Sequence, residues 1–147
     1  MNDNSKAMLR LDNQLCFALY ACSKEVISLY KPYLNPYGLT YTQYITLLVL
    51  WEQDSLTVSE LGNKLLLDSG TLTPLLKKLE KSQLIERVRN KDDERTVTVS
   101  LTEKGKMLQE EFIDLPQKMF CNSGITVDEA IKLKVMLNHL LANTRKQ

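Results

Sequence analysis

The sequence is poor in residues that interrupt helices, and it has no long hydrophobic run. Five glycines and four prolines punctuate 147 residues, so long helices are expected to dominate. The most continuous apolar stretch, from Tyr44 to Trp51, contains Thr46 and is far too short to cross a bilayer. The first six residues lack the apolar core and cleavage site of a signal peptide. We therefore expect a cytoplasmic protein with no membrane segment.

Metal-ligand and disulfide patterns are missing as well. The three cysteines, Cys16, Cys22 and Cys121, are an odd number without metal-ligand spacing, and His139 is the single histidine. A zinc site is therefore not expected. A chain of this length buries a sufficient core without a disulfide framework. We expect no metal and no cofactor, so the thiols either pack in the core or include one that does redox work.

An excess of charge of one sign is also absent. Nineteen Lys and Arg against eighteen Asp and Glu leave a formal net charge of +1. This balance excludes a polybasic protein that binds nucleic acid through bulk charge, but it allows a local basic patch. Apolar residues at 44% and charged residues at 25% are ordinary for a folded domain and exclude a disordered or collagen-like chain.

Three sequences of the form Thr-x-x-Glu/Gln predict helix starts. Thr40, Thr57 and Thr126 each begin such a capping box. In it the Thr hydroxyl accepts a hydrogen bond from an unpaired backbone amide, and the Glu or Gln side chain three residues later accepts one from the Thr amide. The helices begun in this way are expected at about 41–52, 58–66 and 127–143.

Further helices follow from apolar spacing and from capping residues. Apolar residues at intervals of three and four predict one helix over about 11–34, which Pro32 should kink or end. N-cap candidates predict a helix over 69–81. The region 103–120 is expected to be helical with a possible bend, because a glycine and a proline interrupt it.

Two extended segments predict a hairpin after the helix over 69–81. Residues 84–89 and 96–101 form its strands, and the six polar residues 90–95 form a charged tip. Helix, turn, helix and hairpin in this order predict a mainly α (α+β) protein with a winged helix-turn-helix over residues 41–102. This arrangement usually binds double-stranded DNA.

The flanking segments, residues 1–40 and 103–147, are expected to form a helical dimerisation region. The helix segment 130–142 is apolar around most of its axis, and such a helix must be buried. We expect its partner to be the same helix of a second subunit, which gives a homodimer.

Candidate DNA-binding residues lie on the helix over 69–81 and in the hairpin. Hydroxyl side chains at the helix start can bond base edges or phosphates, and lysines one turn later reach the DNA backbone. An acid two positions before Arg95 is expected to orient its guanidinium for a minor groove. The candidates are Ser69, Thr71, Thr73, Lys77, Lys78, Arg87, Arg89, Lys91, Asp93 and Arg95. The alternative is an exposed charged hairpin with no ligand.

Cys16 is the candidate reactive thiol. Tyr20 lies one turn from it on the predicted helix, while Tyr30, nearly four turns away, could approach it only from the antiparallel helix of a partner. Tyr41 begins the next helix. Phenol hydroxyls that donate to sulfur stabilise the thiolate, which is the reactive form. The residues alone favour the alternative, in which Cys16 is an inert core residue, and we interpret Cys22 in that way.

Four segments together resemble the MarR family: residues 14–20 (QLCFALY), 39–44 (LTYTQY), 67–78 (LDSGTLTPLLKK) and 92–95 (DDER). Within that family the chain is similar to the OhrR subgroup, bacterial organic-hydroperoxide sensors that repress transcription. The resemblance implies a homodimer whose winged parts enter adjacent major grooves while Arg95 probes the minor groove. It also implies that Cys16 is the peroxide-sensing thiol, with Tyr20 near it and with Tyr30 and Tyr41 holding it as thiolate across the dimer.

Cys121 stands at a position similar to the resolving cysteine of two-cysteine relatives. The resemblance implies a disulfide between Cys16 of one subunit and Cys121 of the other, and residues 122–124 are expected to be a loop that moves to allow it. An incidental surface cysteine is the alternative.

Together with the resemblance, the sequence predicts a redox-sensing repressor of double-stranded operator DNA, released when organic hydroperoxide oxidises Cys16. A MarR-type repressor controlled by a bound small molecule, with silent thiols, is the alternative. A thiol peroxidase is disfavoured because no general-acid or recycling motif accompanies Cys16, so we do not expect an enzyme.

Overall fold

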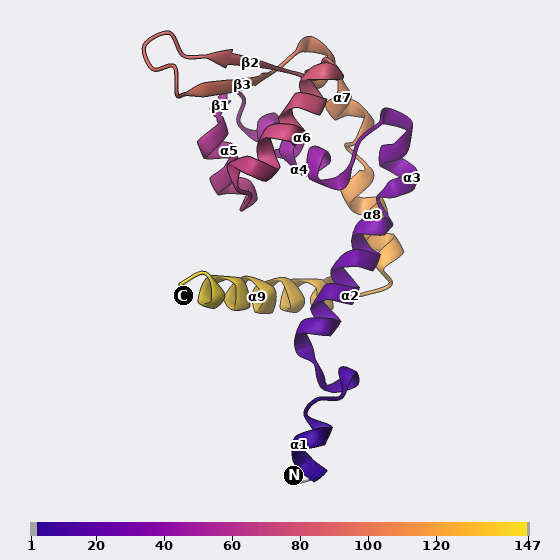
Figure 1. Ribbon diagram of the computed structural model, residues 1–147. Helices are drawn as coiled ribbons and strands as arrows, with labels where there is room; N and C mark the ends of the chain where they lie inside the picture. The colour runs from indigo at the N-terminus through magenta and orange to yellow at the C-terminus, as the bar shows by residue number, and fades with distance from the viewer. Residues whose placement is uncertain (1–2, 147) are drawn as a thin grey trace. The chain divides into compact units, whose positions relative to one another are not determined.

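The computed structural model describes residues 3–146, most of which are helical (Figure 1). The helices are α1 (Asp3–Ala7), α2 (Leu15–Ser28), α3 (Lys31–Leu34), α4 (Tyr41–Glu52), α5 (Val58–Leu65), α6 (Ser69–Lys81), α7 (Glu103–Glu111), α8 (Leu115–Ser123) and α9 (Val127–Thr144). The shorter elements are the 3-10 turns η1 (Leu11–Asn13) and η2 (Asn35–Tyr37) and the strands β1 (Leu56–Thr57), β2 (Ile85–Arg89) and β3 (Val97–Leu101). The chain divides into two compact units, one ending at Ile113 and one beginning at Asp114.

Capping boxes begin the three helices at which the sequence predicts them. At the start of α4, the Thr40 amide donates to Oε1 of Gln43 at 2.9 Å while the Thr40 hydroxyl accepts from the Gln43 amide. The boxes at α5 and α9 repeat this reciprocal pattern with glutamate as the third residue. Since each box fixes where the chain enters a helix, the predicted starts are confirmed.

The helices α4, α5 and α6 and a small antiparallel sheet form a winged helix-turn-helix in the first unit. Three residues, 66–68, join α5 to α6, and Leu66 closes α5 in the left-handed conformation with φ 57°. The strand order is β1-β3-β2, with Leu56 and Arg87 on either side of Val99. The hairpin is therefore confirmed, and β1 adds a third strand. Fully buried aliphatic residues of these elements form the core: Leu47, Leu50, Leu61, Leu72, Leu76, Leu79, Ile85 and Val99.

The expected single helix over 11–34 is wrong at its beginning. Gln14 is extended at φ −94° and ψ 109°, so the α-helix starts only at Leu15. The side chains of Asn13 and Gln14 donate to the backbone oxygens of Ala7 and Met8 at 2.7 and 2.6 Å. These bonds give the backbone an alternative to a continuous helix. At the other end the prediction holds, because Pro32 lies in the first turn of a new short helix, α3.

The expected helical region 103–120 consists of two helices, α7 and α8, with Pro116 in the first turn of α8. Gly105 lies within α7, which continues through it to Glu111. It lies where a Cβ would come 2.1 Å from the Leu84 carbonyl oxygen, so the start of α7 lies against the base of the hairpin only because the side chain is missing. The predicted loop at residues 122–124 is also wrong, since α8 continues to Ser123 and Gly124 caps it.

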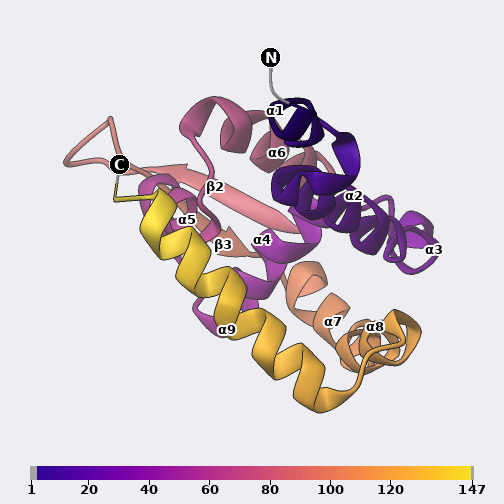
Figure 2. The same ribbon diagram turned by 90° about the horizontal axis from the view of Figure 1, so that it is seen from below.

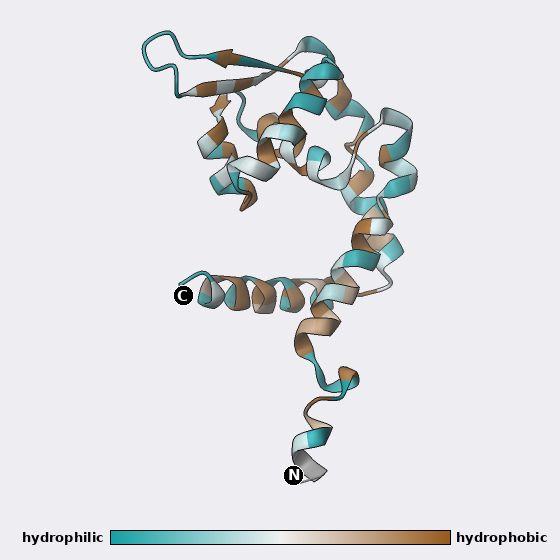
Figure 3. Ribbon diagram, viewed as in Figure 1, coloured by the Kyte–Doolittle hydropathy of each residue, from teal (hydrophilic) through white to brown (hydrophobic). Residues whose placement is uncertain are grey.

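The helices α2 and α9 each expose apolar side chains along their length. Neither has a buried residue. The helix α9, drawn in yellow in Figure 2, shows hydrophobic positions that recur along its length in Figure 3. The large exposed residues of α9 are Val127, Ile131, Leu133, Val135, Met136, Leu137, Leu140 and Leu141. Within residues 3–146 none of the helices combines the length and apolar character that a membrane span needs.

Candidate nucleic-acid interface and thiol region

The helix α6 presents an exposed polar first turn. Its N-cap Asp68 accepts from the Thr71 amide at 2.8 Å, and this hydrogen bond holds the pKa of Asp68 below its usual value. Ser69 and Thr71 are exposed, and Thr73 is half-buried. Leucines on the opposite face of α6 pack into the core, so the hydroxyl face is held outward. This placement is the one expected of a recognition helix.

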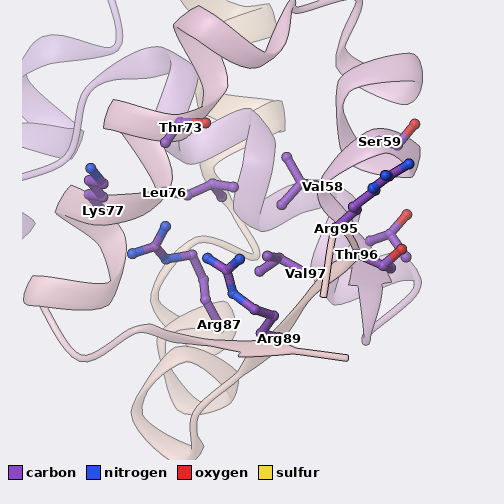
Figure 4. Close-up of a pocket in the computed structure, with 11 residues that line it drawn as sticks. Val58, Ser59, Thr73, Leu76, Lys77, Arg87, Arg89, Arg95, Thr96 and Val97 are labelled. Atoms are coloured by element: carbon purple, nitrogen blue, oxygen red, sulfur yellow. The ribbon is translucent and has the colours of Figure 1, made fainter. Parts of the chain in front are cut away.

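A basic cavity of about 550 Å³ lies between the start of α5, α6 and the hairpin (Figure 4). The cationic side chains of Lys77, Arg87, Arg89 and Arg95 line it, and none of the described residues contributes a carboxylate to the lining. Within residues 3–146, Lys77, Arg89 and Arg95 take part in no ion pair. The cavity therefore concentrates positive charge beside the recognition helix, although the chain as a whole is nearly neutral.

Arg87 differs from the other cations of the cavity because it is already paired. Its Nε and Nη2 donate to the same oxygen of Glu80, Oε2, at 3.1 and 2.7 Å. In Figure 4 the side chains of Arg87 and Arg89 both leave β2 toward α6. The Arg87 guanidinium also holds the pKa of Glu80 below its usual value. The prediction that Arg87 binds DNA therefore stays a prediction, and the structure adds that its guanidinium is paired with Glu80 in the single chain.

Asp93 organises the tip of the hairpin through the backbone. Its carboxylate accepts from the Arg95 amide and from the Thr96 hydroxyl, both at 3.1 Å. In the described chain the Asp93 carboxylate thus shapes the turn through these bonds rather than through the Arg95 guanidinium, and its expected role in orienting that guanidinium for DNA stays a prediction. Arg89 donates from Nη1 to the Glu94 carbonyl at 3.0 Å, while Lys91 is exposed in the same tip.

Apart from the capping residue Thr57, two polar lining residues of the cavity are not among the DNA-binding residues predicted from the sequence. Ser59 lies in the first turn of α5, and Thr96 precedes β3. Both bring a hydroxyl to the cavity. No signal in the sequence separates them from other exposed hydroxyls, because they approach α6 only through the tertiary fold. Lys78, which the sequence does predict as a DNA-binding residue, is exposed on α6 but does not line the cavity.

The three cysteines are all exposed in the single chain. Cys16 is the second residue of α2, and no side chain caps that helix start. Cys22, which the sequence suggests is a core residue, is exposed as well, so that interpretation is wrong for the single chain. Cys121 lies in α8, in the second unit.

Tyr30 and Tyr41 come together, while Tyr20 stays apart from them. The rings of Tyr30 and Tyr41 meet edge to face at 4.9 Å between centroids, and Tyr44 packs against both. Tyr20 is exposed, with the Lys24 ammonium 5.9 Å from its ring centroid. Burial raises the pKa of Tyr30, with a contribution from Tyr41, and raises that of Tyr44 to about 12. Tyr30 and Tyr44 are therefore neutral phenols at pH 7 that can donate a hydrogen bond.

A second cavity, of about 370 Å³, lies beside this tyrosine pair. Tyr30 and Tyr41 line it together with apolar side chains such as Leu34 and Leu39, and Lys31 is its single cation among the lining residues. Its position at the end of α2 and the start of α4 makes it a mostly apolar pocket next to phenol groups.

Comparison with known proteins links this arrangement to transcriptional regulators. Residues 28–112 match the family model described as transcriptional regulator SarA/Rot. The chain is 46% identical over 139 residues to the organic hydroperoxide resistance transcriptional regulator of Bacillus subtilis, and the match covers 95% of each chain.

Solved structures show the same relationship. Reduced AbfR bound to DNA, a protein of Staphylococcus epidermidis, superposes with a TM-score of 0.78 at 34% identity, covering 97% of this chain and 99% of AbfR. A disulfide form of AbfR superposes with a TM-score of 0.64 at 35% identity, covering 96% of this chain and 99% of that one.

Proposed function

The chain belongs to the SarA/Rot family of MarR-like winged-helix transcriptional regulators, and on that premise we propose that it is a redox-sensing repressor. It is a DNA-binding regulator rather than an enzyme. The observation that carries the proposal is the exposed Cys16 in the uncapped first turn of α2, in a chain similar to an organic hydroperoxide resistance regulator.

The winged helix-turn-helix supplies the DNA-binding surface of the proposed repressor. The first turn of α6 enters a major groove, where Ser69, Thr71 and Thr73 reach base edges or phosphates. The basic cavity beside it receives the DNA backbone, with Lys77 and Arg89 as unpaired cations, and Arg95 in the wing reaches the adjacent minor groove. The DNA-bound form of AbfR supports this assignment.

The flanking helices join two copies into a homodimer. Residues 1–40 and 103–147 form the dimerisation region, and the exposed apolar side chains of α9 supply an interface that one copy leaves uncovered. A homodimer places two recognition helices about one DNA turn apart, so a pseudo-palindromic operator is expected. Because high affinity needs both half-sites at once, a small change in their separation releases the DNA.

Cys16 is the proposed sensor thiol. Amides in the first turn of a helix lack intrahelical acceptors, and the helix dipole favours an anion there, so this position suits a nucleophilic sulfur. In the dimer, Tyr30 and Tyr41 of the partner subunit, with Tyr20 nearby, donate to that sulfur. The Tyr30–Tyr41 pairing supports this role, because two phenols already share one site in the single chain.

The oxidation proceeds in two balanced steps. The Cys16 thiolate attacks the terminal oxygen of an organic hydroperoxide, the O–O bond breaks, and an alcohol leaves after taking up a proton. Cys16 is then a sulfenic acid. The thiol of Cys121 from the other subunit attacks that sulfur, and water leaves as the intersubunit disulfide forms. The known disulfide form of AbfR supports the second step.

Gel-shift titration with the three single Cys→Ser variants tests the proposal, with cumene hydroperoxide as the oxidant. Cys16→Ser should bind operator DNA and keep it under peroxide, whereas the matched control Cys22→Ser should be released like wild type. On non-reducing gels, oxidised wild type should show a dimer band that Cys121→Ser lacks. Full release of Cys16→Ser by peroxide would exclude Cys16 as the sensor.

A second candidate function is control by a non-covalent ligand, and the 370 Å³ cavity favours it. Its apolar lining, its phenols and Lys31 suit a small aromatic acid. Titration of Cys16→Ser with aromatic acids such as salicylate separates the two functions. Release of DNA by the ligand, with no response of wild type to peroxide, would favour the ligand-controlled repressor.

A further inference from the structure

The Glu80–Arg87 pair connects the two DNA-binding elements of the winged unit. Glu80 lies in the last turns of α6 and Arg87 in the middle of β2, so the pair joins the recognition helix to the wing. Both guanidinium nitrogens that reach Glu80 bond to one carboxylate oxygen. The side chains are 23% exposed for Arg87 and 39% exposed for Glu80, so the ion pair is accessible yet partly shielded from water.

The position of Arg87 in the sheet directs it toward α6. Arg87 lies opposite Val99 of β3, and it shares the face of β2 with the buried Ile85 and with Arg89. Glu86, one residue away, points to the opposite face and is exposed. Lys77 lies three residues before Glu80 on α6 and also lines the basic cavity. Arg87 therefore lines the cavity that is proposed to receive the DNA backbone, while Glu80 is not among the lining residues and bonds to the Arg87 guanidinium.

We propose that Glu80 and Arg87 are positioning residues that hold the wing in register with the recognition helix, and that Arg87 is not a phosphate ligand. This inference rests on the proposed DNA-binding surface and adds a role for an acid within it. A carboxylate beside DNA repels phosphate, so it lowers affinity unless it stabilises the binding geometry. The pair keeps Arg89 and Arg95 at a fixed distance from α6, so that the major-groove and minor-groove interactions form together.

The alternative role of Arg87 is direct phosphate binding through Nη1, which takes part in neither bond to Glu80. The two roles predict opposite effects when Glu80 is neutralised. If Arg87 binds phosphate, Glu80→Gln frees the guanidinium and removes a repelling charge, so affinity is unchanged or higher. If the pair is a positioning device, Glu80→Gln weakens binding despite the favourable change in charge.

The experiment measures operator affinity as a function of salt concentration for the full-length protein. The probe is a DNA duplex that the wild-type protein selects from a random-sequence pool. We expect Glu80→Gln and Arg87→Gln each to weaken binding about tenfold, because an accessible pair contributes about threefold and the homodimer holds two such pairs. The slope of log affinity against log salt should stay that of wild type in both variants, since the residues that neutralise phosphates are unchanged.

Two further variants separate positioning from a simple loss of stability. The charge-swapped protein, Glu80→Arg with Arg87→Glu, restores the pair in reverse and should recover most of the affinity that either single variant loses. Glu86→Gln removes the same charge from the opposite face of β2 and should not weaken binding. Urea unfolding of each variant checks that the folded fraction at the assay temperature equals that of wild type.

The inference is overturned if Glu80→Gln binds as tightly as wild type or tighter. It is also overturned if Arg87→Gln lowers the salt slope by about 1.8, the value expected when each subunit neutralises one phosphate fewer. Failure of the charge swap to recover affinity contradicts it as well. If the wild-type protein selects no duplex at all, the proposed DNA-binding function itself fails. Because that result needs no variant, it is distinguishable from a failure of the positioning role.

Discussion

Replacing Lys77 by Gln should reduce the salt dependence of operator binding. Lys77 lines the basic cavity from α6, is exposed, and takes part in no ion pair within the described chain. Its ammonium is therefore free to neutralise a phosphate, in contrast to the paired Arg87. Glutamine is nearly as good a helix former as lysine, so α6 should be retained in the variant.

The size of the effect follows from counterion release. One neutralised phosphate contributes about 0.9 to the slope of log affinity against log salt, so a homodimer that neutralises two phosphates fewer should change its slope by about 1.8. Between about 50 and 200 mM salt, wild type should then lose about 12-fold more affinity than Lys77→Gln does. Fluorescence anisotropy with a labelled operator duplex, measured at four or more salt concentrations, gives both slopes.

Lys81→Gln provides the matched control for this measurement. It removes the same charge from α6, but Lys81 lies at the end of the helix and does not line the cavity. Its slope should stay close to that of wild type. Equal slopes for wild type and Lys77→Gln would refute the assignment of the cavity to the DNA backbone, and equal changes in both variants would show that only bulk charge matters.

Three further perturbations have expected outcomes that simple measurements check. Gly105→Ala places a Cβ against the Leu84 carbonyl and should cost about 1–3 kcal/mol, which lowers Tm by about 3–10 °C in thermal unfolding; an unchanged Tm contradicts this. Arg95→Ala should weaken operator binding about tenfold in gel-shift titration, and unchanged affinity would remove the wing tip from the interface. Hydrogen bonds from Thr57 lower the pKa of Glu60, so its stabilising effect is present above pH 4.5 and is lost as pH falls through the lowered value. The urea midpoint of Glu60→Gln should therefore fall less between pH 7 and pH 3 than that of wild type.

Helix starts were predictable because capping is local. A Thr and a Glu or Gln three residues later are enough to fix the entry into α4, α5 and α9, and the structure places both bonds of each box. Strand positions in the hairpin were predictable for the same reason, since alternation and the polar tip lie within about twenty residues. The winged helix-turn-helix follows from these local signals and their order along the chain.

The pairing of side chains across elements was not predictable. Glu80 and Arg87 are seven residues apart, but they lie on a helix and on a strand, and only the packing of α6 against β2 brings them together. The local sequence shows that cations cluster in α6 and the hairpin, but it does not show that Arg87 is in an ion pair and Lys77 is not. Ser59 lines the same cavity from α5, and its position in the sequence does not indicate that it lies near α6 or the hairpin. Five residues predicted from the sequence, Thr73, Lys77, Arg87, Arg89 and Arg95, do line this cavity together, while their individual contacts depend on the fold.

The start of α2 shows how a local departure from periodicity bears on function. The apolar stripe of residues 11–34 satisfies helical spacing throughout, but the side chains of Asn13 and Gln14 bond backward to the backbone and Gln14 stays extended. In a continuous helix the amide of Cys16 would be bonded within a preceding turn. In the observed structure Cys16 instead lies in a first turn whose amides have no intrahelical acceptor. The residues that interrupt the helix thus place Cys16 at a helix start, so Asn13→Ala together with Gln14→Ala should slow the proposed oxidation of Cys16 by organic hydroperoxide when the two substitutions extend the helix toward Leu11.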